Sequence, residues 1–462
     1  MTRYRLRDLA SFGVRREGMR RIYLDNAATT PTHPDVSKAM RPFLRHSFGN
    51  PSSMHSAGQE AKVAIEEARD RVAFMIGASS EEIVFTSGGT EADNFALKGM
   101  AYANEGKKNH IITSSVEHHA VLETCRFLER LGFAVTYLPV DGYGLVDPDD
   151  VRRAITKKSL LISVMHANNE VGTVEPIAEI GEIARESGIS FHTDAVQSAG
   201  HIPARVDDLG VGMLAMSAHK LGGPKGVGAL YVRKGTRIVS FMHGGEQEKG
   251  RRASTENVPG IVGFGKAAEI AQRESDEQAK RLTSLRDGLT RGLMERIDGI
   301  RLNGHPTRRL PGNVNLSVDG VEGEYMLLNL SARGICVSTG SACSASSKEP
   351  SHVLQALGLS REQAIGSIRL SLGRETVERD IGRVLAVLPE VVTRLRTVPS
   401  SAGAAGHPLR DAILKYETEN HTQMLCRYSH MVCLTCPFSG MGRGCTLAKW
   451  QLAKRESGTL AR

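Results

Sequence analysis

The chain has 462 residues, of which 40% are hydrophobic and 24% are charged, and its formal net charge is +8 at pH 7. This composition is typical of a soluble globular protein with a large core, and no run of about 18 apolar residues is present to cross a membrane. At about 150 residues per domain, the length predicts two large lobes or three units.

The positive charge is concentrated at the two ends of the chain. Residues 1–21 carry a net charge of +5 and residues 400–462 carry +4, so the body from 22 to 399 is near −1. A nucleic-acid enzyme is expected to carry a basic stripe on its folded body. We therefore interpret both basic segments as solvated ends, and a nucleic-acid partner is not favoured.

The arginine-rich arm at residues 1–21 lacks the apolar stretch of a secretory signal. It fits a disordered arm, a weak organellar-type presequence, or an upstream start with Met19 as the natural first residue. Seven cysteines, an odd number with no spacing of a small secreted scaffold, favour a reducing cytoplasmic location.

From about residue 60, helical and strand-like patterns alternate. Ile65, Ala68, Val72 and Met75 recur at helical spacing, and Gly77 is suited to end that helix. The expected strands lie, in chain order, in EEIVFTSG, HIITSS, AVTYLPV, LLISVMHA, ISFHTDA, GMLAMSA and GVGALYV. This alternation predicts an α/β fold with a mainly parallel sheet covered on both faces, where ligands bind beyond the carboxyl ends of the strands.

After about residue 275 the pattern changes to a long amphipathic helix, QAKRLTSLRDGLTRGLMERI, and then to a smaller α+β region. We predict five parts: a basic arm at 1–21, a large cofactor-binding domain at 22–275, a small domain at 276–396, a linker at 397–409 and a cysteine-rich tail at 410–462.

Four chemical signals follow the expected strands. Lys220 precedes a glycine-rich turn, where burial can lower the pKa of a lysine for covalent chemistry, although a solvated loop lysine or a phosphate clamp also fits. The turn into a helix at Gly89 and Thr90 exposes amides that suit one phosphate. Asp194 is a strand-end carboxylate that needs a partner, and His118 is an imidazole that alone fits a structural role.

Together these four signals match the needs of pyridoxal 5′-phosphate. That cofactor takes a lysine for covalent attachment, an aspartate for its ring nitrogen, a ring to stack on it and amides for its phosphate. The combination outweighs the separate structural interpretations.

Ten motifs, in order between about residues 21 and 396, resemble those of the NifS/IscS-type cysteine desulfurases, which are pyridoxal-phosphate enzymes of fold type I in the class V aminotransferase family. The motifs are IYLDNAATTP, FGNPSSMHSAG, FTSGGTEADN, VEHHAV, HANNEVG, HTDAVQS, SAHKLGGPKGVGALYV, GGEQEKGRRASTENVPG, STGSACSASSKEPS and SIRLSLGR. The resemblance implies a homodimer that converts L-cysteine to L-alanine and passes sulfur to an iron–sulfur scaffold or another acceptor protein.

The resemblance also implies roles for individual residues. Lys220 would hold the cofactor covalently, His118 would stack on its ring and move protons, and Asp194 would pair with the ring nitrogen. The other cofactor contacts would come from Gln197 at the phenolic oxygen and from Gly89, Thr90, Ser217, His219 and a partner subunit's Thr255 at the phosphate. Asn169 would contact both cofactor and substrate, and Arg369 would bind the substrate carboxylate as a bidentate fork.

Cys343 lies in VSTGSACSASSKEPS, a segment with the composition of a mobile surface loop and no apolar periodicity to bury a thiol. By resemblance, its thiolate would take the substrate sulfur as a persulfide. One motif departs from the family, because Ser254 precedes Thr255 where glycine is usual. A positive φ is disfavoured for serine, so the geometry of that loop is left open.

The tail has four cysteines, Cys426, Cys433, Cys436 and Cys445, in a C-x6-C-x2-C-x8-C pattern. The central C-x2-C spacing suits two thiolates on one metal, so we predict a zinc site or an iron–sulfur cluster. A thiol relay for sulfur and inert or disulfide-forming cysteines are the alternatives.

Two other functions fit parts of the sequence. An aminotransferase or a selenocysteine or sulfinate lyase of the same fold needs no thiol in the Cys343 loop. A non-catalytic scaffold or nucleic-acid-binding protein would use the basic ends and the tail. The presence of every cofactor residue favours the cysteine desulfurase.

Overall fold

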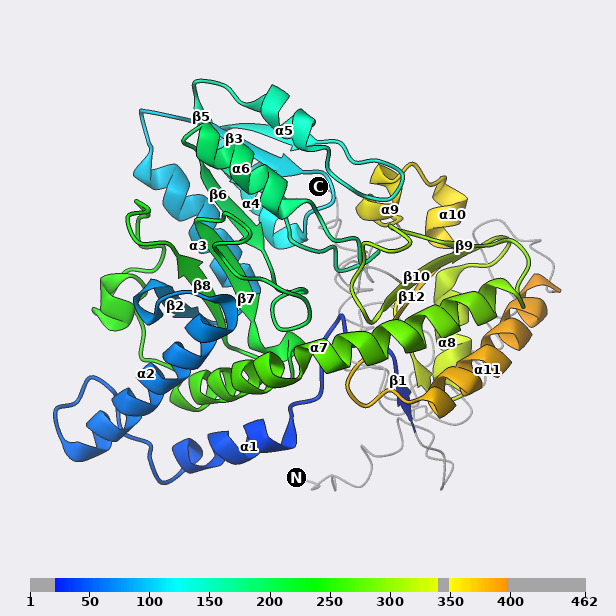
Figure 1. Cartoon of the computed structure of the whole chain (residues 1–462), viewed down its shortest axis with the longest axis horizontal. Helices are drawn as coiled ribbons and strands as arrows, with labels where there is room; N and C mark the ends of the chain where they lie inside the picture. Colours follow the sequence, from blue (N-terminus) through cyan, green and yellow to red (C-terminus); the bar gives the residue numbers. More distant parts are fainter. Residues whose placement is uncertain (1–20, 340–348, 398–462) are drawn as a thin grey trace, which may run out of the picture. The chain divides into compact units, whose positions relative to one another are not determined.

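The computed structural model describes residues 21–339 and 349–397, and its elements belong to the unit Arg21–Leu395 (Figure 1). Cys343, the basic arm and the cysteine-rich tail lie outside these described residues. Within the ranges described, no helix combines the length and hydropathy needed to cross a membrane.

A seven-stranded sheet carries the first half of the chain, with strand order β2-β8-β7-β6-β5-β3-β4. Its strands are β2 (Ile83–Thr86), β3 (His110–Ser114), β4 (Ala134–Leu138), β5 (Ser159–Ser163), β6 (Ser190–Asp194), β7 (Met213–Ser217) and β8 (Gly228–Val232). Every pair is parallel except those made by β8, which runs antiparallel to β2 and β7. The predicted mainly parallel sheet is confirmed, and each strand lies in its expected segment except that β5 begins one residue earlier, at Ser159.

Helices cover both faces of this sheet because its strands are apolar on both sides. One face packs against α2 (Ser56–Ile76), α5 (Pro148–Ala154), α6 (Ile177–Glu186) and the start of α7 (Val258–Met294). The other face packs against α3 (Gly89–Ala103) and α4 (His119–Arg130). Short elements complete this part: α1 (Pro34–Met40), η2 (Arg41–Leu44), η3 (Ser80–Glu82), η4 (Ala218–Lys220) and η5 (Gln247–Gly250).

The end of α2 follows from its sequence. Ile65, Ala68 and Val72 are buried on one face of the helix. Gly77 ends the helix in the left-handed region at φ 68°, and its N–H donates to the last turn. A glycine takes this conformation without the steric cost that other residues pay.

A second, three-stranded sheet of order β12-β10-β9 forms a separate core. Its strands are β9 (Ile300–Leu302), β10 (Asn313–Val318) and β12 (Ser367–Ser371). A separate two-stranded sheet pairs β1 (Ile22–Tyr23), from the start of the described chain, in parallel with β11 (Ile335–Cys336). The accompanying helices are α8 (Gly323–Ser331), α9 (His352–Ala356), α10 (Arg361–Ile365) and α11 (Glu378–Arg396).

Helix α7 contributes to both cores. Phe264 and Ala268 pack in the core of the seven-stranded sheet, whereas Leu289 and Leu293 pack with the three-stranded sheet. Figure 1 shows α7 running from one sheet to the other. The helix begins at Val258, well before the amphipathic stretch seen in the sequence. The sequence pattern did not indicate its first turns, because they are buried and lack a polar face. The proposed domain boundary at 275/276 falls inside this helix and stays a prediction.

Candidate functional site

A cavity of about 260 Å³ lies at the carboxyl ends of the parallel strands. Strands β3, β5, β6 and β7 end at this edge because they are linked by parallel pairs. Strand β2 ends there too, because β2 and β7 both run antiparallel to β8 and so share one direction. Ten of the residues expected at the site line this one cavity: Gly89, Thr90, His118, Asn169, Asp194, Gln197, Ser217, His219, Lys220 and Arg369.

The turn from β2 into α3 borders the cavity at Gly89 and Thr90. At Gly89, a Cβ atom would come within 2.5 Å of the Cγ2 atom of Val196. At Gly228, in the neighbouring strand, a Cβ atom would come within 2.7 Å of the backbone of Gly88. Only glycine therefore fits this close approach, which leaves the first amides of α3 and the Thr90 side chain open to the cavity.

Asp194 ends β6 as a buried carboxylate. It accepts a hydrogen bond of 2.8 Å from the backbone N–H of Val196. Burial raises the pKa of Asp194 to about 6, against the opposing effects of that hydrogen bond and of Lys220. A cation in the cavity next to this carboxylate would favour its ionised form.

A second carboxylate, Asp93, also lines the cavity and was not expected at the site. Burial raises the pKa of Asp93, and the charges of Asp194 and Glu117 raise it further. Its Oδ1 atom lies 3.6 Å from Nε2 of His192, and neither atom has a hydrogen-bond partner among the described residues.

His118 caps α4 and presents its ring to the cavity. Its Nδ1 atom accepts a hydrogen bond of 3.1 Å from the N–H of Ala120. Burial and the charge of Lys220 lower the pKa of His118 to about 4. The ring is therefore neutral at pH 7, with its proton on Nε2.

Lys220 ends the short η4 turn that follows β7. Its Nζ atom donates to the carbonyl oxygens of Ala27 and Ala28, the latter at 2.9 Å. Gln197 also donates to the Ala27 carbonyl, at 2.9 Å. The NAA portion of the first sequence motif thus positions two predicted cofactor residues.

His219 is the remaining titratable side chain on η4. Its Nδ1 atom lies 3.1 Å from the hydroxyl of Thr29, another residue of the first motif. Burial and the neighbouring charges of Lys220 and Lys225 lower the pKa of His219 to about 4. A neutral ring at this position can donate or accept a hydrogen bond at an anionic ligand.

Arg369, on β12, enters the cavity from the three-stranded sheet and is 2% exposed. Its Nη1 atom donates to the carbonyl oxygen of Asn169 at 2.9 Å, and its Nη2 atom donates to Asp25 at 3.0 Å. The Nε atom is buried with no acceptor among the residues described. A fixed, buried guanidinium with an unused donor is suited to a carboxylate ligand.

Both described ends of the Cys343 segment are tied to this cavity. Before it, Ser338 exchanges two backbone hydrogen bonds with Arg369, of 2.7 and 3.1 Å. After it, the hydroxyl of Ser351 donates to Glu170 at 2.6 Å. Cys343 itself lies outside the described residues, but the chain enters and leaves its segment at the cavity wall.

Thr255 is described but does not line this cavity, and it is exposed in the single chain. The serine before it, Ser254, has φ 99°, in the left-handed region. The loop therefore keeps a conformation that favours glycine, although serine occupies the position.

Sequence reasoning missed four residues that support the site: Asp25, Asp93, Glu170 and His352. Asp25, Asp93 and Glu170 stood within recognised motifs, so those motifs were the available signal. His352 was marked by no motif, and its place becomes visible only when α9 brings it to the cavity.

The comparisons with known proteins identify the family. Residues 22–384 match the Aminotransferase class-V family, and the chain belongs to it. Within that family it belongs with the cysteine desulfurases. It is 58% identical over 379 residues to the cysteine desulfurase IscS of Dictyoglomus turgidum, covering 82% of this chain and 96% of the relative.

Two further comparisons agree with this placement. The cysteine desulfurase IscS of Methanosarcina thermophila is 56% identical over 377 residues, covering 82% of this chain and 93% of the relative. A solved NifS-like protein superposes with a TM-score of 0.77 at 40% identity, covering 81% of this chain and all of that one. The predicted fold type and family are confirmed.

Proposed function

We propose that the chain is an L-cysteine desulfurase, which converts L-cysteine to L-alanine and retains the sulfur as a persulfide on Cys343. The observation that carries this proposal is the meeting of Lys220, Asp194, His118 and Arg369 at one cavity, whose wall also anchors both ends of the Cys343 segment. The high identity to cysteine desulfurases over most of the chain supports the same activity.

Pyridoxal 5′-phosphate is the cofactor of this family, and the residues at the cavity fit it. The close approach at Gly89 leaves room that a side chain would fill, and burial raises the pKa of Asp194, a carboxylate that a protonated ring nitrogen would stabilise as its ion. The proposed phosphate ligands are Thr90, Ser217, His219 and, from a second copy of the chain, a partner subunit's Thr255. When bound, the cofactor supplies an electron sink that stabilises negative charge on the substrate carbon.

Each of the residues at the cavity has a separate role in the proposed reaction. Lys220 would hold the cofactor at rest and, once released by substrate, accept the α proton of L-cysteine on Nζ. Arg369 and Asn169 would orient the substrate through its carboxylate. Neutral His118, with its proton on Nε2, would move a proton at the cofactor ring, and Gln197 would hydrogen-bond the phenolic oxygen.

Cys343 would complete the reaction as the nucleophile. Its thiolate attacks the substrate sulfur, so an S–S bond forms as the C–S bond breaks. The electron pair of the broken bond stays with the carbon skeleton, which takes up a proton and leaves as L-alanine. The persulfide sulfur then passes to an acceptor thiol, for which we propose an iron–sulfur scaffold protein.

Lysine substitution tests the proposal against a non-catalytic function. Lys220→Ala should lose the visible absorbance of bound cofactor and all L-alanine formation from L-cysteine. Lys225→Ala is the matched control, because Lys225 is exposed in the same loop and does not line the cavity. Full activity of Lys220→Ala would refute the enzyme assignment.

An aminotransferase or a selenocysteine or sulfinate lyase is the alternative within the fold. Such an enzyme needs no thiol nucleophile, so Cys343→Ala would retain its turnover. We expect Cys343→Ala to lose L-alanine formation from L-cysteine while keeping the cofactor absorbance. Undiminished desulfuration by this variant would favour the alternative.

Three further predictions concern the oligomeric state, the cellular location and the cysteines of the tail. A homodimer is proposed because Thr255 needs a second subunit to reach a phosphate, and a cytoplasmic location remains a prediction from cysteine usage. A zinc or iron–sulfur site at Cys426, Cys433, Cys436 and Cys445 also remains a prediction. Metal analysis and visible spectra of the full chain, compared with a Cys433→Ser/Cys436→Ser variant, test it; equal metal content and identical spectra would contradict it.

A further inference from the structure

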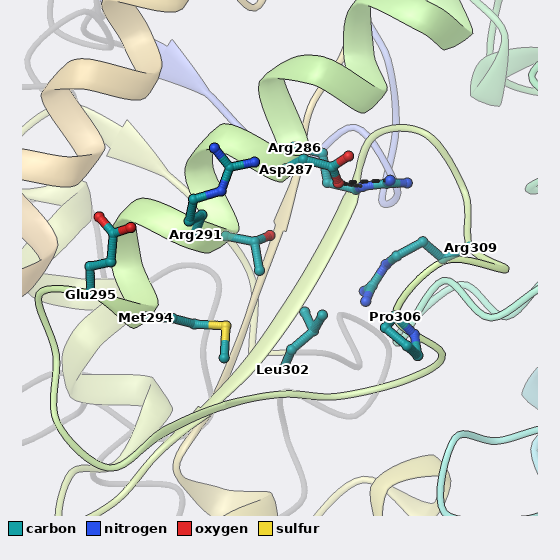
Figure 2. A pocket seen from close by; sticks show the side chains of 9 residues that line it. Arg286, Asp287, Arg291, Met294, Glu295, Leu302, Pro306 and Arg309 are labelled. Carbon is teal, nitrogen blue, oxygen red and sulfur yellow. Dashed lines mark hydrogen bonds and ion pairs between the residues drawn. The ribbon is translucent and has the colours of Figure 1, made fainter.

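A second cavity, of about 400 Å³, opens between the end of α7, β9 and the loop after β9 (Figure 2). It shares no lining residue with the cavity that holds Lys220. Its charged residues are Arg286, Asp287, Arg291, Glu295 and Arg309. Neither the family roles nor the proposed reaction uses this space.

Arg309 is a buried cation without a counter-ion in this cavity. It is 6% exposed, and its guanidinium donates to the carbonyl oxygens of Val171 at 2.9 Å, Asn303 at 3.3 Å and His305 at 3.3 Å. All of these acceptors are neutral. Among the described residues, no carboxylate lies within ion-pair distance of Arg309, and its Nε atom has no acceptor.

Arg286 adds a second buried positive charge. It is 5% exposed and pairs at 2.8 Å with Asp287, whose side chain is about half exposed (Figure 2). Burial and the charge of Arg286 lower the pKa of Arg309 to about 9. Arg286 therefore pairs with a half-exposed carboxylate, and Arg309 has no carboxylate within ion-pair distance among the described residues, whereas buried charges are normally paired.

Apart from Thr290, the rest of the lining is apolar. Met294, Leu302 and Pro306 border the cavity, and Met294 is 50% exposed at its edge. Figure 2 shows the Arg309 side chain directed toward the space between Leu302 and α7. A ligand here would meet positive charge on one side and hydrocarbon on the other.

We propose that this cavity binds an organic carboxylate, with its anionic group at Arg309 and Arg286 and its carbon chain against Met294, Leu302 and Pro306. A guanidinium fork matches carboxylate geometry, and the volume lies within the range of small-molecule pockets. The apolar wall favours a carboxylate with a hydrocarbon body over a bare inorganic anion.

The loop that carries Arg309 is also hydrogen-bonded to the segment that follows Asn169, a residue of the other cavity. Arg309 holds the carbonyl oxygen of Val171, two residues from Asn169, and the backbone of Leu310 donates to Gly172 at 2.8 Å. The loop that carries Arg309 therefore supports the segment that includes Asn169. A ligand that pairs with Arg309 stabilises this support.

Thermal unfolding of the purified holoenzyme with sodium hexanoate tests the proposal. We expect a saturable rise in Tm of at least about 2 °C. Sodium chloride at equal ionic strength and 1-hexanol should not produce it. An absent or non-saturable shift overturns the site, and an equal shift with inorganic phosphate overturns its assignment to an organic carboxylate.

Variants at Thr290 locate the binding, since hexanoate can also reach Arg369. Thr290 lines the second cavity from α7, so Thr290→Glu places a tethered carboxylate there. Thr290→Glu should unfold at a higher temperature than Thr290→Gln and lose the hexanoate shift, which Thr290→Gln should keep. Equal hexanoate shifts in the two variants would contradict the site.

A second pair keeps the test decisive if Thr290→Glu fails to fold. Met294→Glu puts a carboxylate at the exposed edge of the cavity, and Met294→Gln is its neutral match. The glutamate variant should again lose the hexanoate shift. Retention of that shift by Met294→Glu would overturn the proposal.

Discussion

The hydroxyl of Ser351 donates a hydrogen bond of 2.6 Å to Oε2 of Glu170, across 181 positions of sequence. Glu170 is 2% exposed at the cavity wall, and burial raises its pKa against the opposing effect of this hydrogen bond. Ser351 comes shortly after the segment that contains Cys343. The contact therefore fixes where the chain returns from the proposed nucleophile.

Loss of this contact should slow desulfuration without removing the cofactor. We expect Ser351→Ala to lower kcat for L-cysteine about tenfold, the equivalent of about 1.4 kcal/mol. Ser360→Ala is the matched control, because Ser351 and Ser360 cap the short helices α9 and α10, and only Ser351 contacts Glu170. Both variants should lose about 1 kcal/mol of stability; an equal loss of kcat in both would contradict the role of Ser351.

Substitution of Arg369 should weaken substrate binding. Arg369→Lys removes the fork that contacts Asn169 and Asp25 and the unused Nε donor. We expect KM for L-cysteine to rise about 10- to 100-fold, with the absorbance of bound cofactor retained. Arg374→Lys, which alters a partly exposed arginine paired with Glu274, should leave KM unchanged. An unchanged KM in Arg369→Lys would exclude it as the carboxylate ligand.

Buried Glu117 should make the protein less stable as the pH rises. Burial raises the pKa of Glu117 to about 8 from the ordinary value of 4.5 for a glutamate. The folded state therefore favours the protonated acid, and the stability this provides is present below pH 4.5 and is lost as the pH rises through about 8.

Glu117→Gln removes this titration while keeping an oxygen acceptor for Ser114 and Met165. Between pH 5 and pH 9 the free energy of unfolding of the wild type should fall relative to the variant by at least about 1.4 kcal/mol. Urea unfolding at both pH values measures it. The same wild-type-to-variant difference at pH 5 and pH 9 would contradict the raised pKa.

Ser254 should be a site where glycine stabilises. Its φ of 99° costs a residue with a Cβ about 1 to 2 kcal/mol. We expect Ser254→Gly to raise the free energy of unfolding by about 1 kcal/mol, after the extra entropy of glycine in the unfolded chain is counted. Ser254→Ala retains the Cβ and should give no gain; a gain in both variants would point to the serine hydroxyl instead.

The features that the sequence predicts depend on neighbouring residues, whereas most of those it does not predict depend on contacts between distant segments. Local patterns sufficed for the strand segments, for the end of α2 at Gly77 and for Lys220, Asp194, His118 and the turn at Gly89. The other predicted residues of the cavity followed from the family resemblance. The start of α7 at Val258 was missed because a fully buried helix has no amphipathic period. Glu170 and Arg309 owe their burial to contacts with distant segments, which composition and spacing do not encode.

The persulfide on Cys343 is the central claim, and mass spectrometry of the holoenzyme after one equivalent of L-cysteine tests it directly. With free thiols alkylated under non-reducing conditions, the peptide that contains Cys343 should gain one sulfur atom together with one equivalent of L-alanine. Cys343→Ser should show neither. L-alanine formation with the added sulfur on another cysteine, or with no protein-bound sulfur at all, would contradict the account.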